Sequence, residues 1–186
     1  KEILLAQPQF APGERAVVRV EHPRDVLVLV LHAGGALVVA IASIAASDWD
    51  ALAGGKPLVR HAFLVALHET GCAAPASGWV PCYLTAWRAD ALVGAMPLYA
   101  KAHSYGEYVF DWAWADAYQR HGLPYYPKLL GAAPFTPVPG SRLLAVDDAA
   151  RDVLLQAVLA FARQQGLSSA HLLFLSAADR AACARA

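Results

Sequence analysis

The chain has 186 residues, with 15 basic and 15 acidic side chains and 58% hydrophobic residues, which suits one large domain or two small ones. Its balanced charge and lack of Lys/Arg runs argue against intrinsic disorder and against binding of nucleic-acid phosphates, so we expect no DNA partner. Cys72, Cys82 and Cys183 have neither disulfide-framework nor metal-ligand spacing, which indicates free thiols in a reducing, cytoplasmic location and no metal site.

An apolar run at residues 26–46 raises the question of a membrane segment, since only 16% of all residues are charged, against about 25% in soluble domains. The run is long enough to span a bilayer. However, Gly34 and Gly35 interrupt its centre, its β-branched residues favour strands, and no basic cluster flanks it. Two strands at 26–31 and 37–43 explain the pattern as well, and we favour them over a transmembrane helix.

Turn residues and hydrophobic periodicity define the remaining elements. In chain order we expect a strand at 16–20, helices at 47–54 and 58–70, strands at 79–86, 91–100, 128–135 and 142–146, a helix at 147–165, a strand at 170–175 and a helix at 177–186. Ser47 is the expected N-cap of the first helix, and Gly54 its stop. Asp147 or Asp148 should cap the longest helix. This order predicts an α/β or α+β fold whose mixed sheet is covered on both faces.

The segment 97–128 carries the densest chemical signal. It contains nine of the chain's 18 aromatic residues, interleaved with charged and hydroxyl side chains. Such a mixture suits a cleft for a ligand with apolar and polar parts. The alternative is that the rings fill the core between sheet and helix, and for most of them we favour that interpretation.

His103 and Glu107 lie close to the hydroxyl of Ser104, an arrangement that suits general acid–base chemistry. No nucleophile elbow surrounds the serine. Asp111 and Asp116 are five residues apart, so on a helix they do not share a face well, and a carboxylate pair is not expected. The run at 128–133 has some likeness to the pyrophosphate-binding loop of GNAT acetyltransferases, but Pro134 follows where a helix should open, and we interpret the run as a strand.

Four stretches of the sequence resemble one bacterial family. They are WDALAGG at Trp49–Gly55, RHAFLVALHETG at Arg60–Gly71, GWVPCYL at Gly78–Leu84, and the long and most specific segment Pro97–Leu144. All resemble the FemAB-like, GNAT-related proteins of peptidoglycan biosynthesis. The resemblance extends from about Ile41 to the C-terminus.

The resemblance implies a GNAT-like domain with a central mixed sheet flanked by helices, here 37–186, with 1–36 as an extension and 104–126 as an aromatic-rich insertion. It also implies acyl or aminoacyl transfer to an amine, with acyl-CoA or aminoacyl-tRNA as donor and a peptidoglycan precursor as acceptor. Family members have a second such lobe, so the expected partners include a further GNAT-like domain or a second copy of the chain.

The transferase hypothesis assigns roles to the aromatic segment. His103 or Glu107 would take the proton of the amine. Lys128 or Arg120 would contact an anion. The site would be lined by Ser104, Tyr105, Asp111, Trp112 and Asp116. The alternative hypothesis is a non-catalytic binding or assembly module, whose low charge reflects a surface that pairs with another domain or subunit.

Overall fold

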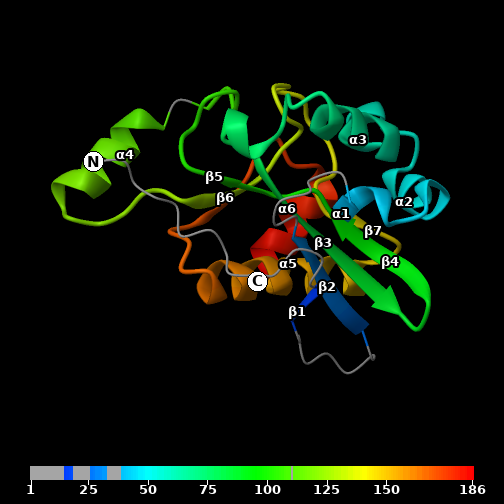
Figure 1. Cartoon of the computed structure of the whole chain (residues 1–186). Helices are drawn as coiled ribbons and strands as arrows, with labels where there is room; N and C mark the ends of the chain where they lie inside the picture. Colours follow the sequence, from blue (N-terminus) through cyan, green and yellow to red (C-terminus); the bar gives the residue numbers. More distant parts are fainter. Residues whose placement is uncertain (1–14, 19–25, 33–38, 110) are drawn as a thin grey trace.

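The computed structural model describes residues 15–18, 26–32, 39–109 and 111–186, with side chains from Ile41 onward. The strands are β1 (Arg15–Val18), β2 (Val26–His32), β3 (Val80–Arg88), β4 (Ala91–Met96), β5 (Tyr99–Lys101), β6 (Lys128–Gly131), β7 (Leu144–Ala145) and β8 (Ala170–Leu172). The α-helices are α1 (Val39–Ala42), α2 (Ala46–Ala53), α3 (His61–Glu69), α4 (Trp112–Arg120), α5 (Asp148–Gln164) and α6 (Ala177–Arg185), and short 3₁₀ turns lie at Pro57–Val59 and Pro75–Ser77. Figure 1 shows their arrangement.

The strands form one mixed sheet. Its main order is β1-β2-β3-β5-β6-β8, antiparallel except for the parallel pair β6–β8. The long strand β3 pairs with β4 along one half and with β5 along the other, and β4 in turn pairs with β7. Pro97 lies between β4 and β5, where a residue without an N–H fits a break in a strand. The prediction of an α+β fold with a mixed sheet is confirmed.

Both faces of the sheet are covered, as the apolar strands predicted. Successive residues of β3 point to opposite faces. Cys82 and Leu84 pack in a cluster with α5, which runs beneath the sheet, whereas Tyr83 packs with Trp49 of α2 in a second cluster. The chain's low charge content therefore follows in part from a sheet that has two buried faces.

Most predicted elements are found, with two corrections near the start of the described side chains. The strand predicted at 37–43 is wrong, because residues 39–42 form α1 and residues 37–38 lie outside the described part. Ile41 and Ile44 are three positions apart and both buried, which is helical spacing, so tertiary packing outweighs the β-branched preference of this run. The predicted cap Ser47 is also wrong, since α2 begins at Ala46 after Ala45; its stop at Gly54 is confirmed by a left-handed backbone, φ 57°.

The strand predicted at 91–100 is two strands, β4 and β5, the strand predicted at 128–135 ends at Gly131, and the helix α4 was not predicted. Other predictions agree closely with the structure. The Asp147 side chain caps α5 by accepting a hydrogen bond of 2.7 Å from the Ala150 amide, and the helix buries its predicted apolar stripe, Val153, Leu154, Ala157, Val158 and Phe161. The strand predicted at 26–31 is β2. The turn at Gly34 and Gly35 lies outside the described residues. Within the described ranges, no helix is long and apolar enough to cross a membrane.

A buried histidine makes the stability of the fold depend on pH. His68 of α3 bonds through Nε2 to the Tyr83 hydroxyl at 2.8 Å, and burial lowers its pKa to about 4. Below its unfolded pKa of about 6.5, the unfolded chain takes up this proton more readily than the folded one. We therefore expect the free energy of unfolding to be highest above pH 6.5 and to fall as the pH is lowered toward 4. The decrease should be about 2 kcal/mol between pH 7 and pH 5.

Urea denaturation of the wild type and of His68→Leu at both pH values checks this. The difference in unfolding free energy between the two proteins should shrink by that amount at pH 5. A difference that does not change with pH would show that His68 is not held neutral.

Candidate functional site

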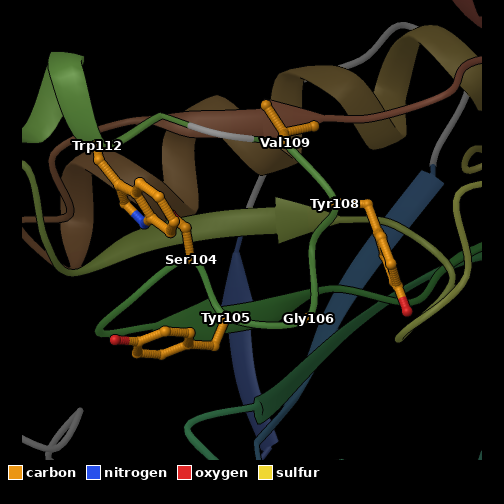
Figure 2. A pocket seen from close by; sticks show the side chains of 6 residues that line it. All are labelled: Ser104, Tyr105, Gly106, Tyr108, Val109 and Trp112. Atoms are coloured by element: carbon orange, nitrogen blue, oxygen red, sulfur yellow. The ribbon is translucent and has the colours of Figure 1, made fainter.

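The segment between β5 and α4 forms a surface pocket of about 310 Å³. Its lining residues are Ser104, Tyr105, Gly106, Tyr108, Val109 and Trp112 (Figure 2). All of them come from the aromatic insertion that the sequence singled out. Most of the lining residues are therefore aromatic or aliphatic, and Ser104 is the small polar residue among them.

The pocket residue Ser104 also belongs to a buried ion cluster centred on Lys128. This residue opens β6, and its side chain is fully buried. Its ammonium donates to Glu107 Oε2 at 2.9 Å, to Asp111 Oδ2 at 2.6 Å and to Ser104 Oγ at 2.8 Å. These three bonds use all three of its N–H groups. Glu107 and Asp111 are buried as well, so charges of both signs are removed from water together.

One carboxylate oxygen of Asp111 accepts several hydrogen bonds. Besides Lys128, the hydroxyls of Ser104 and Tyr125 each donate to Oδ2 at 2.8 Å. Burial alone raises the pKa of this carboxyl, but the hydrogen bonds from Lys128, Ser104 and Tyr125 outweigh it and lower the pKa below the usual range. Asp111 is therefore the carboxylate of the cluster that stays ionised.

In Glu107, burial and the interaction with Lys128 also act on the pKa, but burial outweighs the attraction. Burial raises its pKa, and the attraction of Lys128 compensates only in part. Its Oε1 atom is buried and has no hydrogen-bond partner among the described residues. A carboxylate with a raised pKa and one uncommitted oxygen is suited to accepting a proton.

A second buried lysine fixes the backbone of the pocket. Lys101 of β5 lies opposite Lys128 of β6 in the strand register. Its ammonium lies 3.8 Å from the ring centroid of Trp79 and donates to the Tyr105 carbonyl at 3.0 Å. Burial lowers its pKa to about 8, with Glu107 opposing and Lys128 reinforcing the shift. Lys101 thus ties the segment that carries Tyr105 to the sheet.

Gly106 lets the same segment approach Phe135. Its backbone has φ +81°, and a Cβ atom would lie 2.7 Å from the Phe135 ring. We expect Gly106→Ala to cost about 1–3 kcal/mol more than Gly122→Ala. Gly122 has a similar φ of +69°, but a Cβ atom at that position would have no neighbour within 4 Å, so it isolates the effect of the contact. Thermal denaturation of both variants checks this; equal losses would contradict the close packing.

The comparison with known families finds one match. A family model described as peptidoglycan biosynthesis/recognition, FemAB-like, matches residues 40–186. The chain belongs to the FemAB-like family. This assigns it a cell-wall-related role in peptidoglycan biosynthesis or recognition and confirms the resemblance found in the sequence. No curated protein and no solved structure matches the chain.

The FemAB-like match includes every candidate site residue, and the structure separates them into three groups. Ser104, Glu107, Asp111 and Lys128 form the buried cluster. Tyr105 and Trp112 line the pocket.

The third group consists of candidates outside the cluster and the pocket lining. Asp116 and Arg120 form an exposed ion pair of 2.8 Å along α4. His103 is half-buried, with its ring 5.0 Å from that of Tyr105, and burial followed by the charge of Lys101 lowers its pKa. Glu107 shares Lys128 with Asp111, whereas Asp116 pairs with Arg120, which agrees with the expectation that Asp111 and Asp116 do not form a carboxylate pair.

Sequence reasoning missed several members of this FemAB-like site. Lys101 and the two tyrosines Tyr125 and Tyr126 were not assigned roles, yet Tyr125 bonds Asp111 and Tyr126 bonds the Ser104 hydroxyl at 2.9 Å. A usable signal was present, because Lys101 and Lys128 each adjoin apolar strand residues, where an unpaired lysine is costly. In the described part of the chain, no group of His, Cys, Asp and Glu side chains is arranged to hold a metal ion.

Proposed function

We propose that the chain transfers an acyl or aminoacyl group to an amine of a cell-wall precursor, with the pocket as the acceptor site. The observation that carries this proposal is the contact between the pocket and the buried cluster. Ser104 is one of the pocket-lining residues, and its hydroxyl donates to Asp111, accepts from Lys128 and lies 2.9 Å from the Tyr126 hydroxyl. An amine bound at this hydroxyl has a hydrogen-bonded route to a buried carboxyl with a raised pKa.

The proposed step conserves atoms and charge. The amine nitrogen attacks the acyl carbonyl carbon, the C–N bond forms, and the thioester or ester bond to the donor breaks with its electron pair on the leaving group. Lys128 gives one of its protons to Glu107 Oε2. The neutral amine that this leaves takes the proton of the Ser104 hydroxyl as Ser104 Oγ accepts one from the substrate amine, so Lys128 and Ser104 are restored and Asp111 stays ionised throughout. The proton thus ends on the carboxyl of the cluster with the raised pKa.

Positioning of the amine against the acyl donor supplies the other part of the rate enhancement. Holding an amine against an activated acyl group replaces a bimolecular encounter by an intramolecular step. The pocket segment suits this task because Lys101, Lys128 and Gly106 fix it to the sheet and to Phe135. We propose acyl-CoA or aminoacyl-tRNA as the donor, in line with the family resemblance.

Mass spectrometry of a lysine-containing peptide without sugars tests the proposal. The chain is incubated with this peptide and either acetyl-CoA or aminoacyl-tRNA. We expect one donor to add a single acyl or aminoacyl group to the peptide amine. If the peptide keeps its mass with both donors, and neither donor gives heat on calorimetric titration, the transferase proposal is wrong.

A second function, assembly with another domain or a second copy, is favoured by one observation. Trp114 of α4 is exposed and lies outside the pocket lining, and Figure 1 shows α4 extending away from the sheet. Leu123, three residues after this helix, is exposed as well. Exposed large apolar side chains mark interaction surfaces. Sedimentation velocity over a range of concentrations tests this function. Association that Trp114→Ala abolishes would support it, and a monomer at all concentrations would count against self-assembly.

A further inference from the structure

The hydrogen-bonded group around Lys128 is connected to the surface through Tyr126. Among the described residues, six side chains make up this group: Ser104, Glu107, Asp111, Tyr125, Tyr126 and Lys128. Five of these six are buried, whereas Tyr126 is half-buried. A proton that enters the group by way of its own side chains therefore passes through the Tyr126 hydroxyl.

The other hydrogen bonds of Ser104 fix the direction of its bond to Tyr126. A serine hydroxyl has one proton to donate and two lone pairs that accept. The Asp111 carboxylate only accepts, so it takes the Ser104 proton, and the Lys128 ammonium only donates, so it occupies one lone pair. The other lone pair is left for the Tyr126 hydroxyl at 2.9 Å, and Tyr126 is therefore the donor in that bond.

Tyr126 also has the acceptor atom that a substrate amine needs. The lone pairs of Ser104 are both occupied and its side chain is buried, so an amine bonds Ser104 directly only by displacing a partner. Tyr126 Oη uses its proton on Ser104 and keeps its own lone pairs, since Ser104 is its hydrogen-bond partner among the described residues. An N–H group that arrives at the surface can donate to this oxygen.

The ring of Tyr126 is held in place by its neighbours. It packs edge-on against Tyr125, with the ring centroids 4.9 Å apart and an interplanar angle of 88°. The Lys128 ammonium lies 5.7 Å from the Tyr126 ring centroid, within the range of a cation–π contact. The hydroxyl is therefore positioned against Ser104 before a substrate binds, which proton transfer requires.

From these observations we propose that Tyr126 is a catalytic residue, the group that takes the proton of the acceptor amine and passes it to Ser104. The inference rests on the proposed acyl transfer and identifies the residue that meets the amine. Tyr126 Oη accepts a proton from the amine nitrogen as the C–N bond forms, and it gives its own proton to Ser104 Oγ. Ser104 gives its own proton to Lys128, which has already protonated Glu107. Tyr126 and Ser104 thus end the step unchanged.

Exchange of lysine ammonium protons with water tests this route without an acyl donor or an acceptor. The chain has four lysines, and Lys101 and Lys128 are both buried, so labelling with ¹⁵N-lysine lets NMR follow the two groups. In Tyr126→Phe we expect exchange at Lys128 to slow roughly tenfold or more, because the hydroxyl that links Ser104 to the surface is gone. Lys101 is the internal control, since it bonds the Tyr105 carbonyl, and its exchange should not change.

Two further variants separate the proton route from a general loosening of the fold. Tyr118→Phe removes the hydroxyl of another half-buried tyrosine, whose ring lies 5.2 Å from that of Tyr125, and should leave exchange at Lys128 unchanged. Ser104→Ala breaks the same route one residue further in. It should slow exchange as much as Tyr126→Phe does, and the double variant should slow it no further.

Single-turnover transfer to the lysine peptide supplies the second readout. Tyr126→Phe should slow this transfer by about 100-fold or more, the usual contribution of a group that relays a proton in the transition state. Tyr118→Phe should leave the rate unchanged. An equal rate in wild type and Tyr126→Phe would show that the amine proton leaves by another route.

Three results of the exchange experiment would overturn the assignment of Tyr126. The first is exchange at Lys128 that is unchanged or faster in Tyr126→Phe, and the second is an equal change at Lys101. The third is slowing by Ser104→Ala that adds to the slowing by Tyr126→Phe, because it would reveal two separate routes. Exchange needs no donor, so a peptide that is never acylated counts against the transfer proposal, whereas unchanged exchange counts against Tyr126.

Discussion

Replacing Lys128 by methionine should lower the free energy of unfolding by about 3–5 kcal/mol. The substitution keeps the length and apolar character of the side chain but leaves Glu107 and Asp111 buried without their cation. Removing one partner of a buried ion pair costs far more than the pair itself contributes, because the remaining charge stays desolvated. Urea denaturation at pH 7 measures the loss.

Lys56→Met is the matched control. Lys56 is exposed and its ammonium donates to the Ala53 carbonyl at 3.3 Å, so its loss should stay within about 0.5 kcal/mol. The triple variant Lys128→Met, Glu107→Gln, Asp111→Asn should recover much of the lost stability, since none of the three ionised groups of the cluster remains in it. If the single variant loses no more than the control, the cluster is not desolvated as the structure shows.

Glu107→Gln should slow acyl transfer by about 100- to 10,000-fold, the usual contribution of a general base. The amide cannot take up a proton at neutral pH, but its oxygen can still accept the hydrogen bond from Lys128, so the fold should survive. Single-turnover kinetics with the donor that is active toward the lysine peptide measures the effect.

Glu69→Gln removes the same charge from an exposed position of α3 and should leave the rate unchanged. His103→Gln separates the two bases that the sequence proposed, because His103 is half-buried and outside the pocket lining. Loss of transfer in His103→Gln with a normal rate in Glu107→Gln would reverse the assignment of the base.

Much of the fold could be predicted because local signals agreed with the final packing. The helix α5 shows this best, since its capping aspartate and its apolar stripe are both local features and both are found. The helix α1 shows the opposite case. Its Val39 and Ile41 favour a strand locally, but Ile41 is buried in a cluster that includes Tyr83 and Leu130, which are distant in the sequence. The helix therefore depends on packing that the local sequence does not contain.

The candidate site could be predicted in part for the same reason. Ser104, Glu107 and Asp111 lie within one motif, so the sequence alone places them together. Lys128 meets them only because β5 and β6 pair in a register that sets Lys101 opposite Lys128. The hydrogen bonds of Tyr125 and Tyr126 depend on the path that the chain takes after α4. Residue type and spacing do not contain that information.

The pH dependence of the transfer rate tests the central claim, that Glu107 is the final proton acceptor, most directly. Burial raises the pKa of Glu107, so the ionised form that accepts the proton is depleted as pH falls through a value above the ordinary 4.5. The account predicts a wild-type kcat/KM that rises with pH through this value and then levels, and a Glu107→Gln variant without that rise. An identical rise in both proteins would contradict it.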